Sequence, residues 1–250
     1  MKETLLIIDG SSLLYRAFYA IPSLTDSQGR PTNAVYGFLN MLLKLYEQLE
    51  PHYVAVAFDK DKHTFRNDLY DGYKATRKPA PDDLRPQFPL IREVLECLGI
   101  HVLELEGYEG DDIIGTVARQ MEAKDFHIDI VTGDRDALQL VDENVTVHLT
   151  KKGITNMLAV TPDVMAAEYG YAPSQVVDMK ALMGDTADNI PGVPGVGEKT
   201  AAKLIAQFQH VETLYDRIGE VKGKKLQEKL ADNKDKAFLS KELAMICCSV

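Results

Sequence analysis

The sequence has near its centre the stretch Tyr108-Glu109-Gly110-Asp111-Asp112-Ile113-Ile114-Gly115, in which three carboxylates occupy four positions. The apolar residues from Ile113 to Met121 recur at helical spacing, so these carboxylates stand at the start of a helix. Glu109 and Asp112 are three residues apart and share a face, where like charges repel each other. The stretch is therefore either a solvated, acid-rich first turn or a site for a divalent cation, and these residues alone leave both interpretations open.

Three apolar runs elsewhere in the chain lead into aspartates, and each run has the composition of a buried parallel strand. Carboxyl ends of parallel strands meet at one edge of a sheet, where open α/β sheets bind their ligands. An Asp there commonly caps a helix, but four elements that deliver acids to one edge favour a cation site. The runs and their acids are Thr4–Ile8 with Asp9, His52–Phe58 with Asp59, and Ile128–Val131 with Asp134 and Asp136.

Amphipathic helical stretches separate these strands. Apolar residues follow helical spacing from Val35 to Leu49, before Pro51, and again from Phe88 to Leu98. Short strands are expected at His101–Leu105 and, as an edge, at Val145–Leu149. The alternation of strands and helices predicts an α/β domain with a central, mostly parallel sheet and flanking helices.

The composition is that of an ordinary soluble globular protein, with 45% hydrophobic and 26% charged residues. The N-terminal apolar run is too short for a signal peptide and no stretch could span a bilayer, so we expect a cytoplasmic protein without a membrane partner. The three cysteines have neither disulfide-framework nor zinc-ligand spacing. The net charge of −10 argues at first against a polyanionic partner, so the distribution of charge decides.

Residues 60–92 differ from the rest because basic residues outnumber acidic ones, with aromatic residues interleaved and four prolines. Such a composition suits a surface that tracks a nucleic-acid backbone and stacks bases. A solvated helix followed by a proline-rich loop explains it equally simply, and this segment alone favours that explanation.

The last third of the chain reads as helical, after a connecting span from Lys151 to Pro173. It contains a further acid pair, Asp185 and Asp188, and then a glycine-rich stretch from Gly192 to Thr200 that opens a helix. A nucleotide-binding P-loop is disfavoured because Glu198 is an extra residue before the lysine and no strand precedes the loop. A hairpin between two helices that grips a nucleic-acid backbone fits better.

With these motifs together, the chain resembles the 5′-nuclease (flap endonuclease) family, most closely the branch in which the nuclease is joined to a DNA polymerase. The resemblance covers nearly the whole length. It implies a PIN-like α/β nuclease domain over residues 1–173, with a helical arch near 60–92, and a helix-hairpin-helix DNA-binding subdomain over 174–250. The motifs are Ile8-Asp9-Gly10, Ala57-Phe58-Asp59, Tyr108 to Asp112, Thr132 to Asp136, and Gly184 to Gly192.

The resemblance also implies roles for individual residues. Lys74 and Arg77 would act catalytically on the phosphate at the cut, and Tyr15 would lie near the scissile nucleotide. Two or more Mg²⁺ (or Mn²⁺) ions would be bound, some through water, and K⁺ would bind at the hairpin. The metal-binding set would be Asp9, Asp59, Glu109, Asp111, Asp112, Asp134, Asp136, Asp185 and Asp188; the other DNA-binding residues would be Arg66, Tyr70 and Tyr73 in the arch and Gly192, Gly195, Gly197, Lys199 and Thr200 in the hairpin.

The expected function is divalent-metal-dependent 5′→3′ exonuclease and structure-specific 5′ flap endonuclease activity, with two metals about 4 Å apart activating water and neutralising the phosphodiester oxygens. The partner would be DNA with a 5′ flap or a nick, bound by a monomer. A P-loop-like NTPase and a catalytically dead DNA-structure-binding module are the alternatives. Two features depart from the family pattern: no polymerase region follows, which fits an excised domain or a free-standing nuclease, and Cys247-Cys248 replaces the expected charged residues.

Overall fold

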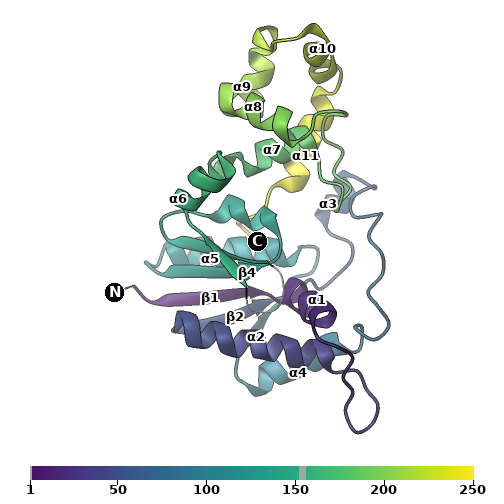
Figure 1. The fold of residues 1–250 in the computed structure, drawn as a ribbon, viewed down its shortest axis with the longest axis vertical. Coiled ribbons are helices and arrows are strands. Elements are labelled where there is room, and N and C mark those ends of the chain that lie inside the picture. The colour runs from purple at the N-terminus through teal and green to yellow at the C-terminus, as the bar shows by residue number, and fades with distance from the viewer. Residues whose placement is uncertain (1, 152–155) are drawn as a thin grey trace.

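The fold is built on one six-stranded sheet. In this computed structural model, which describes residues 2–151 and 156–250, the strand order is β3-β2-β1-β4-β5-β6 (Figure 1). The first five strands are mutually parallel, and β6 is antiparallel to β5. The strands are β1 (Thr4–Asp9), β2 (Tyr53–Ala57), β3 (His101–Leu103), β4 (His127–Thr132), β5 (Val145–Thr150) and β6 (Met157–Val160).

The sheet confirms the predicted α/β fold, with helices on both faces. Alternate residues of β1 serve the two faces: Leu6 and Ile8 pack against one set of helices, and Leu5 and Ile7 against another. One face carries α1 (Gly10–Ala20), α2 (Asn33–Leu49) and α4 (Gln87–Cys97); the other carries α5 (Gly110–Glu122) and the 3₁₀ helix η1 (Arg135–Leu140). The strand order reverses between β1 and β4, so the carboxyl end of β1 lies at the switch point where such sheets bind ligands.

Helix α1 begins directly after the first strand. The carboxylate of Asp9 accepts a hydrogen bond of 2.9 Å from the backbone N–H of Ser12 and so caps the helix. A Cβ on Gly10 would lie 2.5 Å from the Phe58 ring, so this turn requires glycine. The motif Ile8-Asp9-Gly10 therefore places one carboxylate rigidly at the sheet edge.

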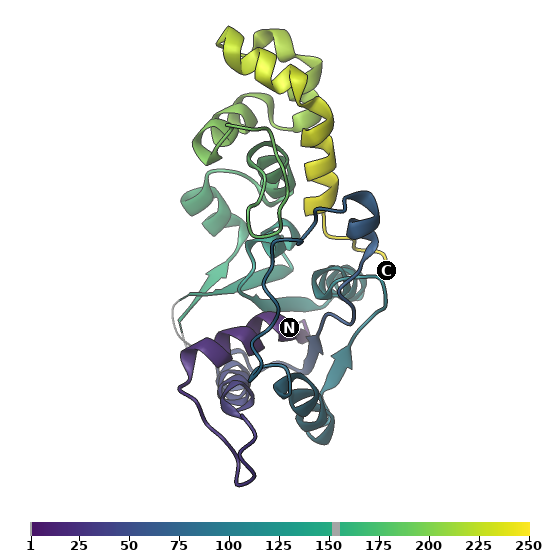
Figure 2. The same cartoon turned by 90° about the vertical axis from the view of Figure 1, so that its right-hand side faces the viewer.

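The segment 60–92 is not the helical arch that we expected. Its first part contains only the short helix α3 (Phe65–Leu69), the stretch around Lys74 forms turns, and α4 starts only at Gln87. Lys74 has a left-handed φ of 54°, which interrupts a helix, and Pro79 and Pro81 disfavour helical backbone in the residues before them. Pro86 caps α4 and Pro89 lies in its first turn, where a missing N–H is tolerated. In Figure 2 this segment descends from beside the C-terminal helices, past the sheet, to α4.

The C-terminal third forms a helical unit with its own apolar core. It comprises α7 (Val176–Met183), α8 (Glu198–Phe208), α9 (Val211–Asp216), α10 (Lys224–Asp232) and α11 (Lys234–Ala244) with the 3₁₀ helix η4 (Ile218–Glu220). Between β6 and α7 lie α6 (Pro162–Val164), the π-helix η2 (Met165–Tyr169) and the 3₁₀ helix η3 (Pro173–Gln175). The expected connecting span 151–173 thus contains strand and helix, while its residues 152–155 lie outside the described residues.

After α11 the chain returns to the sheet and ends beside α5 (Figure 1). Ile246 belongs to the apolar core between the sheet and α5. Within residues 2–151 and 156–250, none of the helices combines the length and apolarity needed to cross a membrane.

Candidate metal centre and nucleic-acid cleft

A cleft of about 1930 Å³ opens at the carboxyl edge of the sheet. Its walls come from the ends of β1, β2 and β4, from the start of α5, from the segment around Lys74 and from the loop between α7 and α8. The predicted site residues that line it are Asp9, Tyr15, Asp59, Lys74, Arg77, Glu109, Asp111, Asp134, Asp185, Asp188 and Gly197.

Asp9 lies at the centre of the acidic edge. The Thr132 hydroxyl donates a 2.6 Å hydrogen bond to Asp9 Oδ2, while the Ser12 N–H bonds Oδ1. Burial raises the pKa of Asp9 from 3.8 to about 7; these two hydrogen bonds oppose the shift, and the charges of Asp59 and Asp134 add to it. The fold thus holds a carboxylate where its charge is poorly compensated.

Asp59, Asp111 and Asp134 complete this uncompensated group. Burial raises the pKa of Asp111 well above its ordinary value, with further contributions from Asp9 and Asp134. Asp59 is exposed and accepts a 2.9 Å hydrogen bond from the Gly110 N–H. Asp134 caps η1 through a 2.9 Å hydrogen bond from the Asp136 N–H.

The donor set of this group fits a hard divalent cation, because it consists of carboxylate oxygens that repel one another in a partly buried cleft. Among the described residues, no three acidic, histidine or cysteine side chains are grouped closely enough to ligate one ion as they stand. An ion held by this group would have to take part of its coordination from water.

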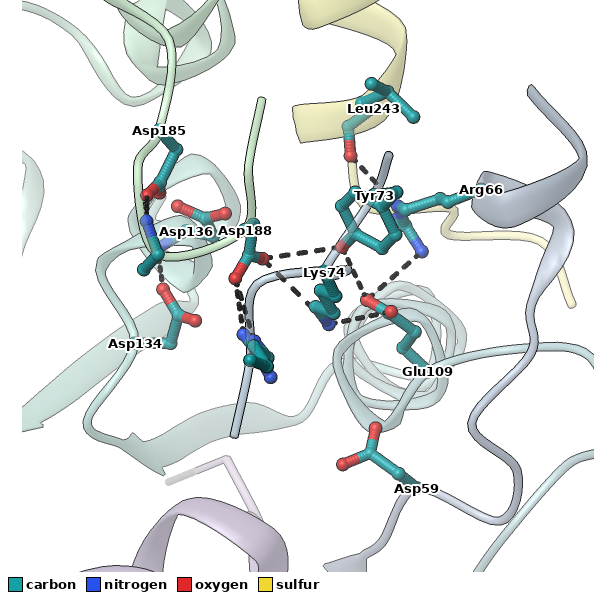
Figure 3. A network of polar contacts seen from close by, with 12 residues as sticks. Asp59, Arg66, Tyr73, Lys74, Glu109, Asp134, Asp136, Asp185, Asp188 and Leu243 are labelled. Atoms are coloured by element: carbon teal, nitrogen blue, oxygen red, sulfur yellow. Dashed lines mark hydrogen bonds and ion pairs between the residues drawn. The ribbon is translucent and has the colours of Figure 1, made fainter. Parts of the chain in front are cut away.

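A second group of acids is already neutralised by cations of the chain (Figure 3). Lys74 Nζ lies 2.7 Å from Glu109 Oε1, and Arg77 lies 2.5 Å from Asp188 Oδ1. The Tyr73 hydroxyl lies between the two acids and donates to Glu109 Oε2 at 3.0 Å. Although burial opposes it, proximity to these carboxylates raises the pKa of both Lys74 and Arg77. Both cations therefore stay charged in the cleft.

Lys180 links two further acids of the site, Asp136 and Asp185, and was not predicted as a site residue. Its ammonium contacts the carboxylate of Asp136 and lies 2.5 Å from Asp185 Oδ2. Asp136 is buried and does not line the cleft; burial raises its pKa to about 7, the Asp134 charge adds to the shift, and Lys180 opposes it. Lys180 is the single cation of α7, whose other residues except Asp178 are apolar, and this cation five residues before Asp185 was the available sequence signal.

Two predicted site residues are corrected by the structure. Arg66, expected to contact DNA, is 2% exposed and makes two 2.7 Å hydrogen bonds to Asp112. Asp112, expected to bind metal, is 0% exposed, and both of its oxygens are already shared among Arg66 and backbone N–H groups. These two side chains satisfy each other inside the protein and do not face the cleft.

The tyrosines that we expected to contact DNA differ in their exposure to the cleft. Tyr15 is half-buried and lines the cleft, so its ring is available to a ligand. Tyr73, in contrast, is 4% exposed, and Tyr70 packs beside it against Ile190 and Leu243. The expectation that Tyr73 contacts a threaded strand is therefore corrected, because Tyr73 is buried and supports Glu109. Tyr70 is half-buried, so its contact with DNA stays a prediction.

In the hairpin, Gly192 has a structural function. It is buried, its N–H donates to the Ser240 hydroxyl at 2.9 Å, and an added Cβ would lie 2.3 Å from the backbone of Gly184. Its expected contact with DNA is thus corrected as well. Gly195, Gly197 and Lys199 are exposed, and Thr200 is half-buried at the start of α8, so the role of these four in DNA binding stays a prediction.

Comparisons with known proteins agree with this architecture. A family model described as the 5′-3′ exonuclease N-terminal resolvase-like domain matches residues 4–170, and one described as the 5′-3′ exonuclease C-terminal SAM fold matches residues 171–250. The chain is 51% identical over 246 residues to DNA polymerase I of Bacillus caldotenax and 50% identical over 245 residues to that of Bacillus subtilis. Each match covers 98% of this chain but 28% of the relative, so the chain spans about 28% of the length of these relatives.

Solved structures show the same fold at lower sequence identity. T5 5′-exonuclease with bound divalent metal ions (zinc) superposes with a TM-score of 0.80 at 22% identity, covering 98% of this chain and 90% of that one. The bacteriophage T5 flap endonuclease in a pseudo-enzyme-product complex with DNA and metal ions gives a TM-score of 0.77 at 22% identity, with 99% and 90% covered. Because the two family models together match residues 4–250, the chain belongs to the 5′-3′ exonuclease family.

Proposed function

We propose that this nuclease hydrolyses DNA phosphodiesters near a 5′ end, as a 5′→3′ exonuclease and a 5′ flap endonuclease, and that it requires Mg²⁺ or Mn²⁺. The observation that carries the proposal is the group Asp9, Asp59, Asp111 and Asp134 at the cleft: burial raises the pKa of Asp9 and Asp111, and the charges of the neighbouring acids add to the shift. Carboxylates that a protein buries together in a cleft without enough counter-charge are suited to a divalent cation.

The chain would hold two or more ions with this group, and Glu109, Asp136, Asp185 and Asp188 would contribute directly or through water. Bound metal would activate the attacking water and neutralise the phosphodiester oxygens. Lys74 and Arg77, which neutralise Glu109 and Asp188 in this structure, are placed to contact a phosphate that enters the cleft. Tyr15 would stack near the scissile nucleotide.

The hairpin between α7 and α8 would bind the duplex part of the substrate. Gly195, Gly197 and Lys199 are exposed, and Gly197 also borders the cleft, so a duplex held there leads into the acidic edge. Backbone groups and a lysine fix a phosphate backbone without reading bases. A K⁺ ion on the hairpin carbonyls is part of this proposal.

The two alternative functions have less support. A P-loop needs its glycine N–H groups free for phosphate, but the Gly192 N–H is bonded to Ser240, and the loop follows α7 where a P-loop follows a strand. A catalytically dead binding module would not need the uncompensated carboxylates. The relatives are DNA polymerases, so we include in the proposal a role in primer and flap removal beside a polymerase region, as a cytoplasmic monomer.

The experiment that tests this proposal uses 5′-labelled flap, nicked and blunt duplex DNA, each incubated with the protein in Mg²⁺, in Mn²⁺ or in EDTA. We expect short 5′ products and released flaps with metal, and none in EDTA. Binding of flap DNA without cutting in any metal would support the dead module, and ATP hydrolysis without cutting would support the NTPase. Either result would refute the proposal.

A further inference from the structure

A buried ion pair outside the cleft joins three distant parts of the chain. Arg66 comes from α3 and Asp112 from the first turn of α5, and they form a bidentate contact with both N–O distances at 2.7 Å. Neither residue lines the cleft, and both are almost inaccessible to solvent. Such a pair is specific in geometry and is strongly dependent on its surroundings to remain charged.

The surroundings are supplied by the C-terminal segment Met245–Val250. Arg66 also donates to the carbonyls of Leu243 at 2.9 Å and Met245 at 2.7 Å, and the Cys247 N–H donates to Asp112 Oδ1 at 2.8 Å. The Val250 N–H then bonds the Thr116 hydroxyl on α5 at 3.1 Å. The segment is therefore fixed along α5 by its backbone rather than by its cysteine side chains.

The close fit of this segment to α5 also depends on a glycine. A Cβ on Gly115 would meet Ile246 at 2.7 Å and the Cys248 sulfur at 2.9 Å. Helix α5 thus has a smooth surface where the segment lies, and Ile246 fills the core beneath it.

The pair is connected directly to the acidic edge. Asp112 Oδ2 accepts the Glu109 N–H at 3.0 Å, and Arg66 lies 3.5 Å from Glu109 Oε2. In the sequence, Asp111 lies between Glu109 and Asp112. The backbone that carries both Glu109 and Asp111 is consequently held from behind by Arg66, Asp112 and the C-terminal segment.

We propose that Arg66 and Asp112, completed by the segment Met245–Val250, are positioning residues that set the metal-binding carboxylates of Glu109 and Asp111. Each Asp112 oxygen already accepts two hydrogen bonds, Oδ1 from Arg66 and Cys247 and Oδ2 from Arg66 and Glu109, so no acceptor capacity remains for a cation. The inference rests on the proposed metal-dependent function.

The central variants are Asp112→Asn and Arg66→Lys, because each keeps the approximate size of the side chain but cannot make the bidentate pair. We expect the single-turnover cutting rate at saturating flap DNA in Mg²⁺ to fall by about 10- to 100-fold, the range typical of residues that support metal ligands. Mn²⁺ binding without DNA, followed by the electron paramagnetic resonance of free Mn²⁺, should weaken by a similar factor. Flap affinity in EDTA should stay within about twofold, because neither residue faces the cleft.

Two matched controls separate positioning from general stability. Asp129→Asn weakens the buried contacts of Asp129 with His127 and His148 on the face of β4 turned away from α5, so it should lower the melting temperature but leave Mn²⁺ binding and the cutting rate within about twofold. Cys247→Ala keeps the backbone N–H that Asp112 accepts and should behave as the parent. Cys247→Pro removes that N–H and should reproduce part of the loss, which also covers the case that Asp112→Asn does not fold.

The combined variant Arg66→Lys/Asp112→Asn should lose no more than the worse single variant, because both act through one contact. Additive losses would mean that Asp112 acts on the metal by itself and would overturn the inference. Parental Mn²⁺ binding and cutting in Asp112→Asn, or losses equal to those of Asp129→Asn at equal melting temperature, would overturn it too. A parent that binds Mn²⁺ but cuts no DNA would instead refute the proposed function.

Discussion

Each acid of the cleft differs in how its charge is compensated. Glu109 and Asp188 are paired with Lys74 and Arg77, whereas Asp9 has only a hydroxyl and a backbone N–H as partners. The pKa of Asp9 is raised from 3.8 to about 7, so the folded protein binds a proton there that the unfolded chain releases between these pH values. The stability that this proton confers is therefore lost as the pH rises from about 4 to 7.

This sign gives a first prediction. In EDTA the melting temperature of the parent should fall between pH 5.5 and pH 8, and Mg²⁺ should restore it most at pH 8, because a cation replaces the lost protons. Asp9→Asn should reduce both the fall of the melting temperature with pH and its recovery by Mg²⁺. A change of 1 kcal/mol in the free energy of unfolding corresponds to about 2–4 °C in melting temperature for a chain of this size. The pKa of His127 is also raised, by a hydrogen bond to Asp129, but its share is independent of Mg²⁺. A parental Mg²⁺ response in Asp9→Asn, measured by thermal unfolding, would contradict the prediction.

A second prediction at this scale concerns Lys74. If it leaves Glu109 to contact the phosphate at the cut, Lys74→Ala should slow single-turnover cleavage by about 100-fold, the usual effect of losing one charged transition-state contact. Flap affinity should change far less, and a bulky block on the 5′ end should impede cutting by the parent. Equal losses of affinity and rate, measured by filter binding and quenched flow, would show that Lys74 only docks DNA.

Among the elements, the loop between α7 and α8 carries two separate functions. Its first half packs tightly through Gly184 and Gly192, which both have left-handed backbone with φ of 71° and 58°. Its second half is exposed at Gly195, where φ is 77° and the Lys229 ammonium would lie 2.5 Å from an added Cβ. The first half therefore sets the acids Asp185 and Asp188, and the second half leaves the backbone of Gly195 exposed beside the Lys229 ammonium.

The third prediction tests the hairpin from Gly192 to Thr200, in which Lys199 is the second residue of α8. Lys199→Ala should weaken DNA binding evenly across sequences and reduce the slope of log affinity against log salt by about one phosphate contact. Lys124→Ala removes the same charge just after α5, at the opposite edge of the sheet, and should leave the slope unchanged. The hairpin role would be refuted if Lys199→Ala bound with the parental slope at every salt concentration.

A fourth prediction concerns α7, whose Lys180 contacts Asp136 and Asp185. Lys180→Met keeps the aliphatic packing but leaves two carboxylates without their cation, which destabilises a buried group by about 3–5 kcal/mol. Unfolding in EDTA should therefore require less urea, and Mg²⁺ should recover more of the stability than it adds to the parent. Identical urea midpoints for the two proteins would exclude this pairing.

Strands β1, β2 and β4 could be predicted from sequence because each is an apolar run that ends in or leads into an aspartate, whereas β6 lies in a span that carries no such signal. The function of Asp112 could not, since a carboxylate that pairs with Arg66 and one that faces a cleft look identical in a motif. Arg66 and Tyr73 were similarly assigned to a DNA surface by the family resemblance, whereas long-range contacts with α5 and α11 bury them. Local spacing in the sequence predicts which side chains share a face of a helix or strand. Whether such a side chain faces the cleft or is buried depends on residues that are distant in the sequence.

For the whole molecule, the net charge of −10 would oppose DNA binding unless the acidic field at the cleft is cancelled. The cleft brings the uncompensated carboxylates together with Lys74, Arg77 and the hairpin. Bound divalent cations would reverse the local field where the phosphate must enter. Metal binding, DNA binding and cutting should thus be coupled in this protein, although the sheet and the helical unit fold around separate cores.

Asp111→Ala provides the most direct measurement of the central claim that the acidic edge is a metal-dependent hydrolytic site. In EDTA this variant should bind flap DNA at least as tightly as the parent, because it removes a negative charge from the cleft. In Mg²⁺ its single-turnover cutting should be almost abolished, with the melting temperature in EDTA as a control for folding. Cutting by Asp111→Ala at a near-parental rate in Mg²⁺ would contradict the account.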